Sequence, residues 1–268
     1  MSAAGNTTRV LVTGATGGIG RATCVELIRQ AKSEGKAVSI AAVASRSGAA
    51  LEALTAELNS LGARAIGLHA NLADAASCVQ LIDDATAFCG GLDALVSNAG
   101  ITRPAPLADQ TVEDWDTVFS VNTRATWLLA RAARKALAES RGAIVAVASM
   151  SGMYPHPGYG AYSASKAALL MLCRQLAQEW AADGIRVNTV SPGMIRTPLT
   201  ERVYQNEEVA ARREAMVPLG RIGRPEDIAR AVAYLLGDHA AYVTGENLRV
   251  DGGLCDRFLG TIPGVARA

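Results

Sequence analysis

Short runs of β-branched and aliphatic residues alternate along the chain with longer segments in which apolar residues recur at helical spacing. Seven runs have the length and composition of buried strands, namely Arg9 to Thr13, Ala37 to Ala44, Arg64 to Ala70, Asp93 to Ser97, Ala143 to Ala148, Ile185 to Val190 and Asn247 to Val250. Two intervening segments show the spacing i, i+3, i+4 and i+7, at Cys24, Leu27, Ile28 and Ala31 and at Leu169, Leu172, Cys173 and Leu176. The alternation predicts βαβ units around a buried parallel sheet.

The domain organisation follows from the lack of any Pro- or Gly-rich linker between these elements. We therefore expect a single α/β domain over residues 1–268, a doubly wound, seven-stranded parallel sheet with helices on both faces, and terminal extensions at 1–8 and 254–268. The stretch from Pro192 to Pro218 has charges too irregular for an apolar helix face, and it is our candidate for a mobile lid.

Composition narrows the class of partner. Half of the residues are apolar, 19% are charged and the formal net charge is +1, which favours a small organic substrate over nucleic acid. The N-terminal residues do not resemble a secretion signal and no long apolar run is present, so we expect a cytoplasmic protein outside the membrane. The cysteines lack the spacing of a metal site, and we expect reduced core thiols at Cys24, Cys78, Cys89, Cys173 and Cys255.

The first strand leads directly into a glycine-rich turn, residues 13–20, and then into a helix. Glycines let the backbone approach a pyrophosphate, and the unpaired N–H groups of a helix N-terminus attract its negative charge. We therefore expect a Rossmann-type dinucleotide site at Gly14, Thr16, Gly17, Gly18, Ile19 and Gly20. The spacing Gly-x-x-x-Gly-x-Gly departs from the common Gly-x-Gly-x-x-Gly, and the alternative is a tight turn that only needs positive φ angles.

The end of the second strand indicates which dinucleotide binds. NAD-binding proteins place a carboxylate there against the ribose 2′-hydroxyl, whereas this chain has Ser45, Arg46 and Ser47. A guanidinium can bind a 2′-phosphate through two hydrogen bonds, and a serine adds a donor. We therefore expect NADP(H). The alternative is an ordinary solvated arginine at a strand end.

Tyr162 and Lys166 lie four residues apart at the start of a strongly periodic helix, so they share one helical face. A fixed ammonium beside a phenol stabilises the phenolate and makes tyrosine a usable proton donor to a carbonyl oxygen. Ser149, at the end of the fifth strand, can place its hydroxyl on the same oxygen. The alternative is a half-buried tyrosine with a lysine that extends its amine to solvent.

Taken together, these motifs closely resemble the short-chain dehydrogenase/reductase family. The resemblance is carried by Thr-Gly-x-x-x-Gly-Ile-Gly at 13–20, Asn98-Ala99-Gly100, Asn122, Ser149, Tyr162-x-x-x-Lys166, and the sequences at 191–198, 218–227, 243–245 and 250–253. It covers residues 8 to about 253 and implies an NADP(H)-dependent oxidoreductase that interconverts carbonyl and alcohol groups. It also implies a homotetramer.

The resemblance further implies a role for each matching residue. Tyr162 would be the catalytic acid and base, Ser149 would hold the substrate oxygen, and Lys166 would bind the nicotinamide ribose and lower the pKa of Tyr162. Asn122 would anchor a water of a proton relay, although it could instead cap the following helix. Further cofactor contacts would come from Asn71, Leu72, Asn98, Ala99, Gly100, Pro192, Gly193, Ile195 and Thr197.

The subfamily that the pattern resembles most is the 3-oxoacyl-(acyl-carrier-protein) reductases. Two positions depart from the expected pattern. Ser97 replaces a common Asn before Asn98-Ala99-Gly100, and Asp183 stands where a basic residue commonly meets the acidic carrier protein. Asp183 therefore argues against a carrier-protein partner, although Arg134, Lys135 and Arg141 could still form a basic patch.

Three functions remain open at this stage. The first is NADPH-dependent reduction of a 3-oxoacyl thioester or related ketone, and the second is dehydrogenation of a sugar, polyol, steroid or other secondary alcohol. The third is a non-catalytic NADPH-binding scaffold, against which the intact set Ser149, Tyr162, Lys166 and Asn122 counts. The substrate would meet Met150, Met153, Tyr154, His156, Tyr159, Met194, Val203 and Tyr204. His156 could equally be a surface turn residue.

Overall fold

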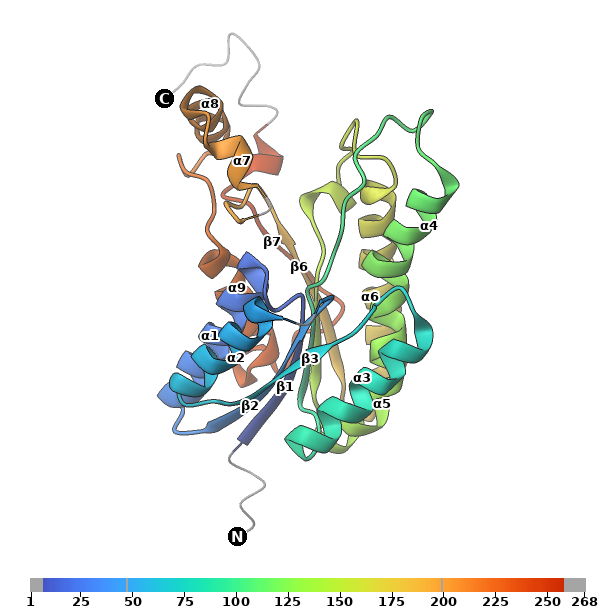
Figure 1. Cartoon of the computed structure of the whole chain (residues 1–268), viewed down its shortest axis with the longest axis vertical. Helices are drawn as coiled ribbons and strands as arrows, with labels where there is room; N and C mark the ends of the chain where they lie inside the picture. The colour runs from blue at the N-terminus through green and yellow to red at the C-terminus, as the bar shows by residue number, and fades with distance from the viewer. Residues whose placement is uncertain (1–6, 47, 199, 258–268) are drawn as a thin grey trace.

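The computed structural model describes residues 7–46, 48–198 and 200–257. A single sheet of seven parallel strands, in the order β3-β2-β1-β4-β5-β6-β7, forms its centre (Figure 1). The strands are β1 (Thr7–Thr13), β2 (Ala37–Ala44), β3 (Arg64–His69), β4 (Ala94–Ser97), β5 (Ala143–Val147), β6 (Arg186–Pro192) and β7 (Asn247–Val250). The expected doubly wound fold is confirmed.

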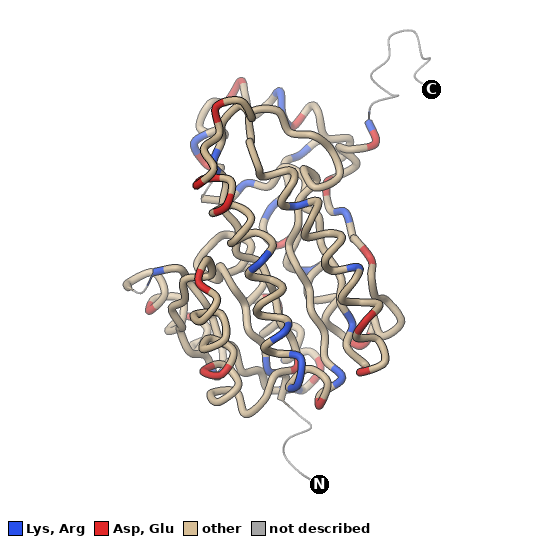
Figure 2. Tube along the Cα trace, turned by 90° about the vertical axis from the view of Figure 1, so that its right-hand side faces the viewer, with Lys and Arg blue, Asp and Glu red and all other residues tan. Residues whose placement is uncertain are grey.

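The helices cover both faces of the sheet. They are α1 (Gly18–Ser33), α2 (Ala49–Ser60), α3 (Ala75–Cys89), α4 (Val112–Phe119), α5 (Ala125–Ser140), α6 (Tyr162–Trp180), α7 (Glu201–Tyr204), α8 (Glu207–Met216) and α9 (Pro225–Leu236). Helices α1, α2 and α9 pack on one face, and α3, α5 and α6 pack on the other (Figure 1). Figure 2 turns the second layer toward the viewer and shows charges of both signs along its helices.

The predicted apolar stripes explain how the helices attach. All four stripe residues of α1 are buried, and they pack with strand residues such as Val10 and Ile40. In α6 the stripe is broader than the spacing predicts: Leu172 is only half-buried, while Leu170 and Ala177 are buried. The expected core thiols are buried at four positions, and Cys255 is half-buried. No helix within the described residues is long and apolar enough to cross a membrane.

The order of the strands determines where a ligand can bind. Strand β1 pairs with β2 on one side and with β4 on the other, so the chain leaves the carboxyl ends of β1 and β4 in opposite directions. In open α/β sheets the ligand site lies outside the carboxyl ends of the strands at such a point. The glycine-rich turn follows β1, and residues 98–100 follow β4.

The segment from Pro192 to Pro218 contains structure that its charge pattern does not predict. It forms the short helices α7 and α8 above the carboxyl edge of the sheet (Figure 1). Tyr204 and Val217 are buried in a small cluster with Ile222, separate from the two main cores. The segment therefore has its own apolar anchor. Its proposed mobility stays a prediction.

At the opposite, amino edge of the sheet, Arg9 and Asp93 connect β1 to the start of β4. The Asp93 carboxylate accepts the Arg9 backbone N–H at 2.7 Å and the guanidinium Nε at 2.9 Å, and a further guanidinium nitrogen donates to the Gly90 carbonyl. Both side chains are about three-quarters buried, which reduces screening by water.

We expect Asp93→Ala to lower the free energy of unfolding by about 2 kcal/mol, because a partly buried guanidinium and a backbone N–H lose their acceptor together. Glu208→Ala is the matched control, since Glu208 pairs with Arg212 in an exposed helical i, i+4 arrangement whose contribution is close to zero. Urea unfolding of both variants measures the difference. Equal losses would show that the Arg9–Asp93 contact is not structurally important.

Candidate active site

The glycine-rich turn is held against the end of β4 by a set of reciprocal hydrogen bonds. The Thr13 hydroxyl accepts the backbone N–H groups of Asn98 and Ala99, both at 3.0 Å. The Asn98 side-chain amide donates to the carbonyls of Thr13 and Gly14 at 3.0 and 3.1 Å. Gly14 adopts a φ of 63°, and a Cβ there would lie 3.0 Å from the Ala99 Cα. The turn therefore needs glycine both for its backbone conformation and for its close contact with β4.

Helix α1 begins at Gly18, and no side chain caps its N-terminus. The first N–H groups of the helix have no intrahelical acceptor, so they are donors for a bound anion. The loop after β6 lies against this end: a Cβ on Gly18 would stand 3.2 Å from atoms of Thr197 and Pro198. The structure thus brings together the glycine-rich turn, which includes Thr16, Gly17 and Ile19, and the loop after β6, for which the family resemblance implies cofactor contacts.

Ser45 and Arg46 directly follow β2, and both are exposed. The end of β2 lies beside the glycine-rich turn, because the Ala15 N–H donates a hydrogen bond to the Val43 carbonyl. Arg46 forms no ion pair with any described residue. Ser47, the third expected contact, lies outside the described residues.

Asn71 and Leu72 follow β3 along the same edge of the sheet. The Asn71 carboxamide oxygen accepts the Ala73 N–H, which fixes a local turn, and Leu72 points into the core. Leu72 can therefore offer a ligand only its backbone.

Pro192 is the last residue of β6 and is buried there. The next residue, Gly193, must be a glycine, since a Cβ there would meet Asp251 at 2.7 Å. Ile195 is buried and forms a β-bridge with Gly223. The Ile195 side chain thus belongs to the protein core, which leaves its backbone and the half-buried Thr197 to face a ligand.

Lys166 is a buried ammonium in the first turns of α6, with 3% of its surface exposed. Its Nζ donates to the Val147 carbonyl at 2.8 Å, and a Cβ on Gly100 would lie 3.4 Å from both this Nζ and Asn122 Oδ1. Burial lowers the pKa of Lys166 to about 8. The structure therefore brings Lys166, Asn122 and Gly100 together at the carboxyl ends of β4 and β5.

Tyr162 and Ser149 lie near this ammonium, and burial is the main influence on the pKa of Tyr162. Burial raises the pKa of Tyr162, and its hydrogen bond with Ser149 opposes that shift only in part. Lys166 Nζ stands 5.9 Å from the centre of the Tyr162 ring and is directed at the Val147 carbonyl. Desolvation of the phenolate is therefore the dominant influence on the pKa of Tyr162. The expectation that Lys166 lowers this pKa stays a prediction.

Asn122 is buried in a π-helical turn, Ser120–Arg124, between α4 and α5. Its Oδ1 accepts the Ile101 N–H at 2.8 Å, and its Nδ2 donates to the Ile101 carbonyl and to Ser165 Oγ, both at 3.0 Å. The alternative that Asn122 caps a helix is wrong, because the helix continues through it and its carboxamide is engaged with other elements. A π-turn of this kind occurs often at functional sites.

Two residues that the sequence did not indicate, Thr123 and Ser165, complete the hydrogen bonds between the π-helical turn and α6. Thr123 Oγ1 donates to the Ser165 carbonyl at 2.8 Å, and Ser165 Oγ donates to the Tyr162 carbonyl at 2.7 Å. Ser165 thereby connects the π-turn to the helical turn between Tyr162 and Lys166. Its position directly before Lys166 was the only sequence signal available.

His156 lies in the connection from β5 to α6. Its ring stacks on Tyr159 with the centres 3.7 Å apart, and its Nδ1 is 3.0 Å from Ser151 Oγ. Ser151 N in turn donates to Ser149 Oγ at 3.1 Å. His156 is therefore tied to the site and is not an isolated surface turn residue. Met153 and Tyr154 are exposed in the same connection, whereas the Tyr204 ring is buried in the small cluster beneath α7.

The basic patch expected near Asp183 is partly neutralised. Arg134 donates two hydrogen bonds to the Asp183 carboxylate, at 3.0 and 2.7 Å, and lies 5.7 Å from the Trp180 ring centre. Arg134 is therefore not a free cation, and Asp183 precedes β6 at the amino edge of the sheet, away from Tyr162.

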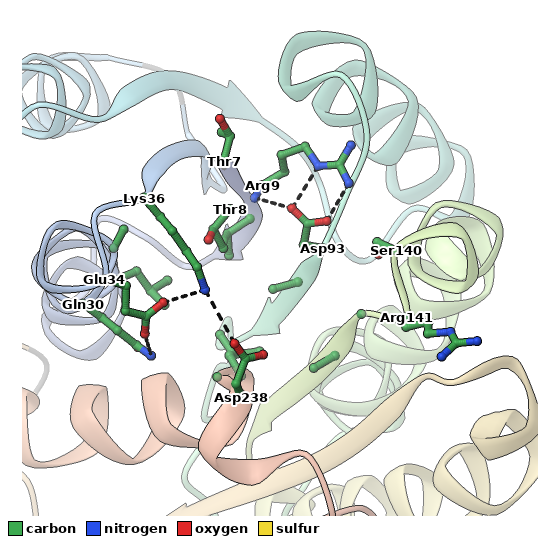
Figure 3. A pocket seen from close by; sticks show the side chains of 18 of the residues that line it. Thr7, Thr8, Arg9, Gln30, Glu34, Lys36, Asp93, Ser140, Arg141 and Asp238 are labelled. Carbon is green, nitrogen blue, oxygen red and sulfur yellow. Dashed lines mark hydrogen bonds and ion pairs between the residues drawn. The ribbon is translucent and has the colours of Figure 1, made fainter. Parts of the chain in front are cut away.

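A pocket of about 710 Å³ also lies at the amino edge (Figure 3). Several of its charged side chains pair with one another: Lys36 contacts Glu34 at 2.8 Å and Asp238 at 3.6 Å, and Arg9 contacts Asp93. The pocket lies at the edge of the sheet opposite to Tyr162. We assign it no role in the site.

Known proteins are similar to this chain over most of its length. A family model described as Enoyl-(Acyl carrier protein) reductase matches residues 14–255. The 3-oxoacyl-(acyl-carrier-protein) reductase FabG of Thermotoga maritima is 36% identical over 245 residues, which cover 91% of this chain and 96% of that protein. FabG of Escherichia coli is 39% identical over 246 residues, with coverage of 91% and 96%.

Solved structures are similar over almost the whole chain. A putative short-chain alcohol dehydrogenase from Sinorhizobium meliloti has a TM-score of 0.85 and 36% identity, covering 93% of this chain and 96% of its own. A putative NAD(P)-dependent gluconate 5-dehydrogenase from Beutenbergia cavernae, solved with bound NADP, has a TM-score of 0.84 and 35% identity, with coverage of 95% and 98%. The chain belongs to the short-chain dehydrogenase/reductase family.

The buried ammonium of Lys166 should cost stability in the protein without ligand. Its pKa falls from 10.5 when unfolded to about 8 when folded, a difference of about 3 kcal/mol. The cost is fully present below pH 8, where both states are protonated, and disappears as the pH rises to 10.5. We therefore expect Lys166→Met to be more stable than the wild type at pH 7.

Urea unfolding at pH 7 and pH 10 measures this effect, and the difference between the two proteins cancels the titration of all other groups. The advantage of Lys166→Met should shrink at pH 10. An advantage of the same size at both values would contradict a lowered pKa for Lys166.

Proposed function

We propose that this protein is an NADP(H)-dependent oxidoreductase that reduces a carbonyl to a secondary alcohol, as its 3-oxoacyl-(acyl-carrier-protein) reductase relatives do by name. The observation that carries the proposal is the convergence of Tyr162, Ser149 and Lys166 beside an uncapped helix N-terminus at one edge of the sheet. A scaffold that only bound the nucleotide would not need the hydroxyls of Tyr162 and Ser149 together at this position.

The residues present fit a bound NADP(H). The free donors at the start of α1 suit the pyrophosphate. Arg46 is exposed and has no ion pair with a described residue, so together with Ser45 it suits a 2′-phosphate. No carboxylate at the end of β2 competes for a ribose hydroxyl. When bound, the nicotinamide supplies the hydride that the carbonyl carbon accepts.

The chain's own residues then manage the proton and the developing charge. Ser149 donates a hydrogen bond to the carbonyl oxygen and holds it next to Tyr162, whose hydroxyl gives its proton to that oxygen as the alcohol forms. Lys166, whose Nζ is held near Tyr162 by its hydrogen bond to the Val147 carbonyl, binds the nicotinamide ribose through its ammonium. Burial keeps Tyr162 protonated before the reaction, which is the state required for reduction.

The resulting tyrosinate must regain a proton from solvent. Lys166 is adjacent to Tyr162. Asn122 and Lys166 both approach Gly100, so these two side chains lie close to each other. Because both ends of the Asn122 carboxamide are occupied, a relay water would bind the main-chain carbonyl of Asn122 instead of its side chain. The side chain would position the π-turn.

The relatives favour two kinds of substrate. The FabG relatives are named for 3-oxoacyl thioesters, whereas the Beutenbergia cavernae structure is described as a putative gluconate 5-dehydrogenase. The second candidate function is therefore oxidation or formation of a polar secondary alcohol. A carrier-protein partner is disfavoured by the paired, acidic Asp183. By resemblance to the family we also propose a cytoplasmic homotetramer.

Replacing Tyr162 with Phe should reduce kcat by about 10² to 10⁴, because the proton donor is lost while the ring is kept. NADPH affinity should stay nearly the same. NADPH oxidation with a panel of ketones, thioesters and alcohols, together with fluorescence titration of NADPH, tests both parts. Tyr242→Phe is the control, since Tyr242 is fully exposed. A Tyr162→Phe protein that keeps most of its kcat would rule out this role.

Replacing Arg46 with Asp should lower kcat/KM for NADPH by about 10- to 100-fold, because a charge-assisted contact becomes a repulsion. The preference should shift toward NADH. Arg174→Asp makes the same change of net charge on the exposed face of α6 and should leave the cofactor preference unaltered. Equal use of NADH and NADPH by the wild type would contradict the assignment.

A further inference from the structure

Ser149 and Tyr162 stand at the two ends of the connection from β5 to α6. In the middle of this connection, residues 153–158 are all exposed except His156, which is half-buried. His156 lies between two prolines, whose rings fix their own φ angles and restrict the residue before each of them. The contacts of His156 therefore determine how this exposed stretch is attached to the site.

On one side, the His156 ring connects to Ser149 through Ser151. His156 Nδ1 is 3.0 Å from the hydroxyl of Ser151, a residue that is only 5% exposed. Among the described residues, this ring nitrogen is the one hydrogen-bond partner of the Ser151 hydroxyl, and a buried hydroxyl needs such a partner. The Ser151 N–H in turn donates to Ser149 Oγ at 3.1 Å.

This N–H determines how the Ser149 hydroxyl is directed. It occupies one lone pair of Ser149 Oγ, so the Ser149 hydrogen is left to point at Tyr162, with which Ser149 forms a hydrogen bond. A displaced Ser151 would therefore release the hydroxyl that is proposed to hold the substrate oxygen.

On the other side, His156 connects to Tyr162 through Tyr159. The Tyr159 N–H donates to the His156 carbonyl at 3.2 Å, and the Tyr162 N–H donates to the Tyr159 carbonyl at 3.1 Å. The rings of His156 and Tyr159 stack with their centres 3.7 Å apart and their planes at 21°. Two successive turns thus run from His156 to the first residue of α6. The residue that bonds to Ser151 therefore also sets the start of this helix.

The chemical state of the ring suits the contact with Ser151. Burial lowers the pKa of His156, so the imidazole is neutral at pH 7. A neutral imidazole has one nitrogen with a free lone pair, and Nδ1 can accept the Ser151 hydroxyl proton while the other ring nitrogen keeps its hydrogen. Two groups that act on the same carbonyl oxygen lose rate when their separation varies, because the reactive geometry tolerates little displacement.

We propose that His156 is a positioning residue that holds the hydroxyls of Ser149 and Tyr162 in one arrangement. It acts through its hydrogen bond with Ser151 on one side and through the turn at Tyr159 on the other. The inference rests on the proposed carbonyl reduction and adds the residue that sets the geometry of its two hydroxyls. Because Nδ1 is engaged by Ser151, this nitrogen is not available to the substrate.

Two substitutions of His156 separate its hydrogen bond from its ring. His156→Phe keeps a ring on Tyr159 but loses the bond, and it should lower kcat about 10-fold while NADPH affinity stays the same. His156→Asn loses the stack but retains an amide that can bond to Ser151, so its kcat should stay within about threefold of the wild type. NADPH oxidation and fluorescence titration of NADPH measure both quantities. His239→Phe is the matched control, since His239 is exposed in the short helix Asp238–Ala240 after α9.

Ser151→Ala tests the same contact from its other end. It should lower kcat by the same factor as His156→Phe, and the double variant should lose no more than either, because both substitutions remove one interaction. Losses that multiply in the double variant would overturn the proposal, as would an unchanged kcat in His156→Phe or an equal loss in His156→Asn. Urea unfolding checks that each variant is folded. If His156→Phe does not fold, Ser151→Ala and His156→Asn decide the question.

Absence of any turnover in the wild type would contradict the proposed function itself, and positioning is then decided by spectroscopy. In protein labelled at the tyrosine Cζ carbon, the NMR signal of Tyr162 responds to its hydrogen bond with Ser149, and Tyr162→Phe identifies that signal. The signal should move in His156→Phe and in Ser151→Ala toward its position in Ser149→Ala, and it should stay in place in His156→Asn. An unmoved signal in both of the first two variants refutes the proposal.

Discussion

The parallel pairing of β1 with both β2 and β4 is the constraint on which the site depends. Because the chain leaves the carboxyl ends of β1 and β4 in opposite directions, the backbone there is free to meet a ligand. The reciprocal bonds among Thr13, Gly14 and Asn98 join the two ends into one rigid wall. The uncapped start of α1 is fixed against that wall, so the donors for a pyrophosphate are oriented before any ligand arrives.

Burial has opposite consequences for the two catalytic candidates. It makes the ammonium of Lys166 less stable and the neutral hydroxyl of Tyr162 more stable, since desolvation always disfavours the charged form. Burial of Lys166 is therefore unfavourable for stability, and in the proposed function a bound ribose and a developing negative charge would relieve that cost. Stability and the proposed catalytic role are opposed at this residue.

The hydrogen bonds around Asn122 position the elements that carry the candidate site residues. Asn122, Ser165 and Thr123 bond chiefly to one another and to backbone atoms, and they join the π-turn to the first turns of α6. Such fully bonded buried networks limit the number of ways a core can pack. The segment from Pro192 to Pro218 contributes Tyr204 and Val217 to a small apolar cluster that is separate from the two main cores.

The sequence by itself determined the strands and the doubly wound sheet, and it predicted the candidate site residues 13–20, 149, 162 and 166, because local periodicity and short motifs report burial and turn geometry directly. It misjudged what depends on contacts between distant segments. The helices α7 and α8, the bonded state of Asn122, the pairing of Arg134 with Asp183 and the raised pKa of Tyr162 were decided by the tertiary structure. Each of these features depends on the burial of a group and on the partners that it meets after folding. Residues that are neighbours in the sequence do not reveal those partners.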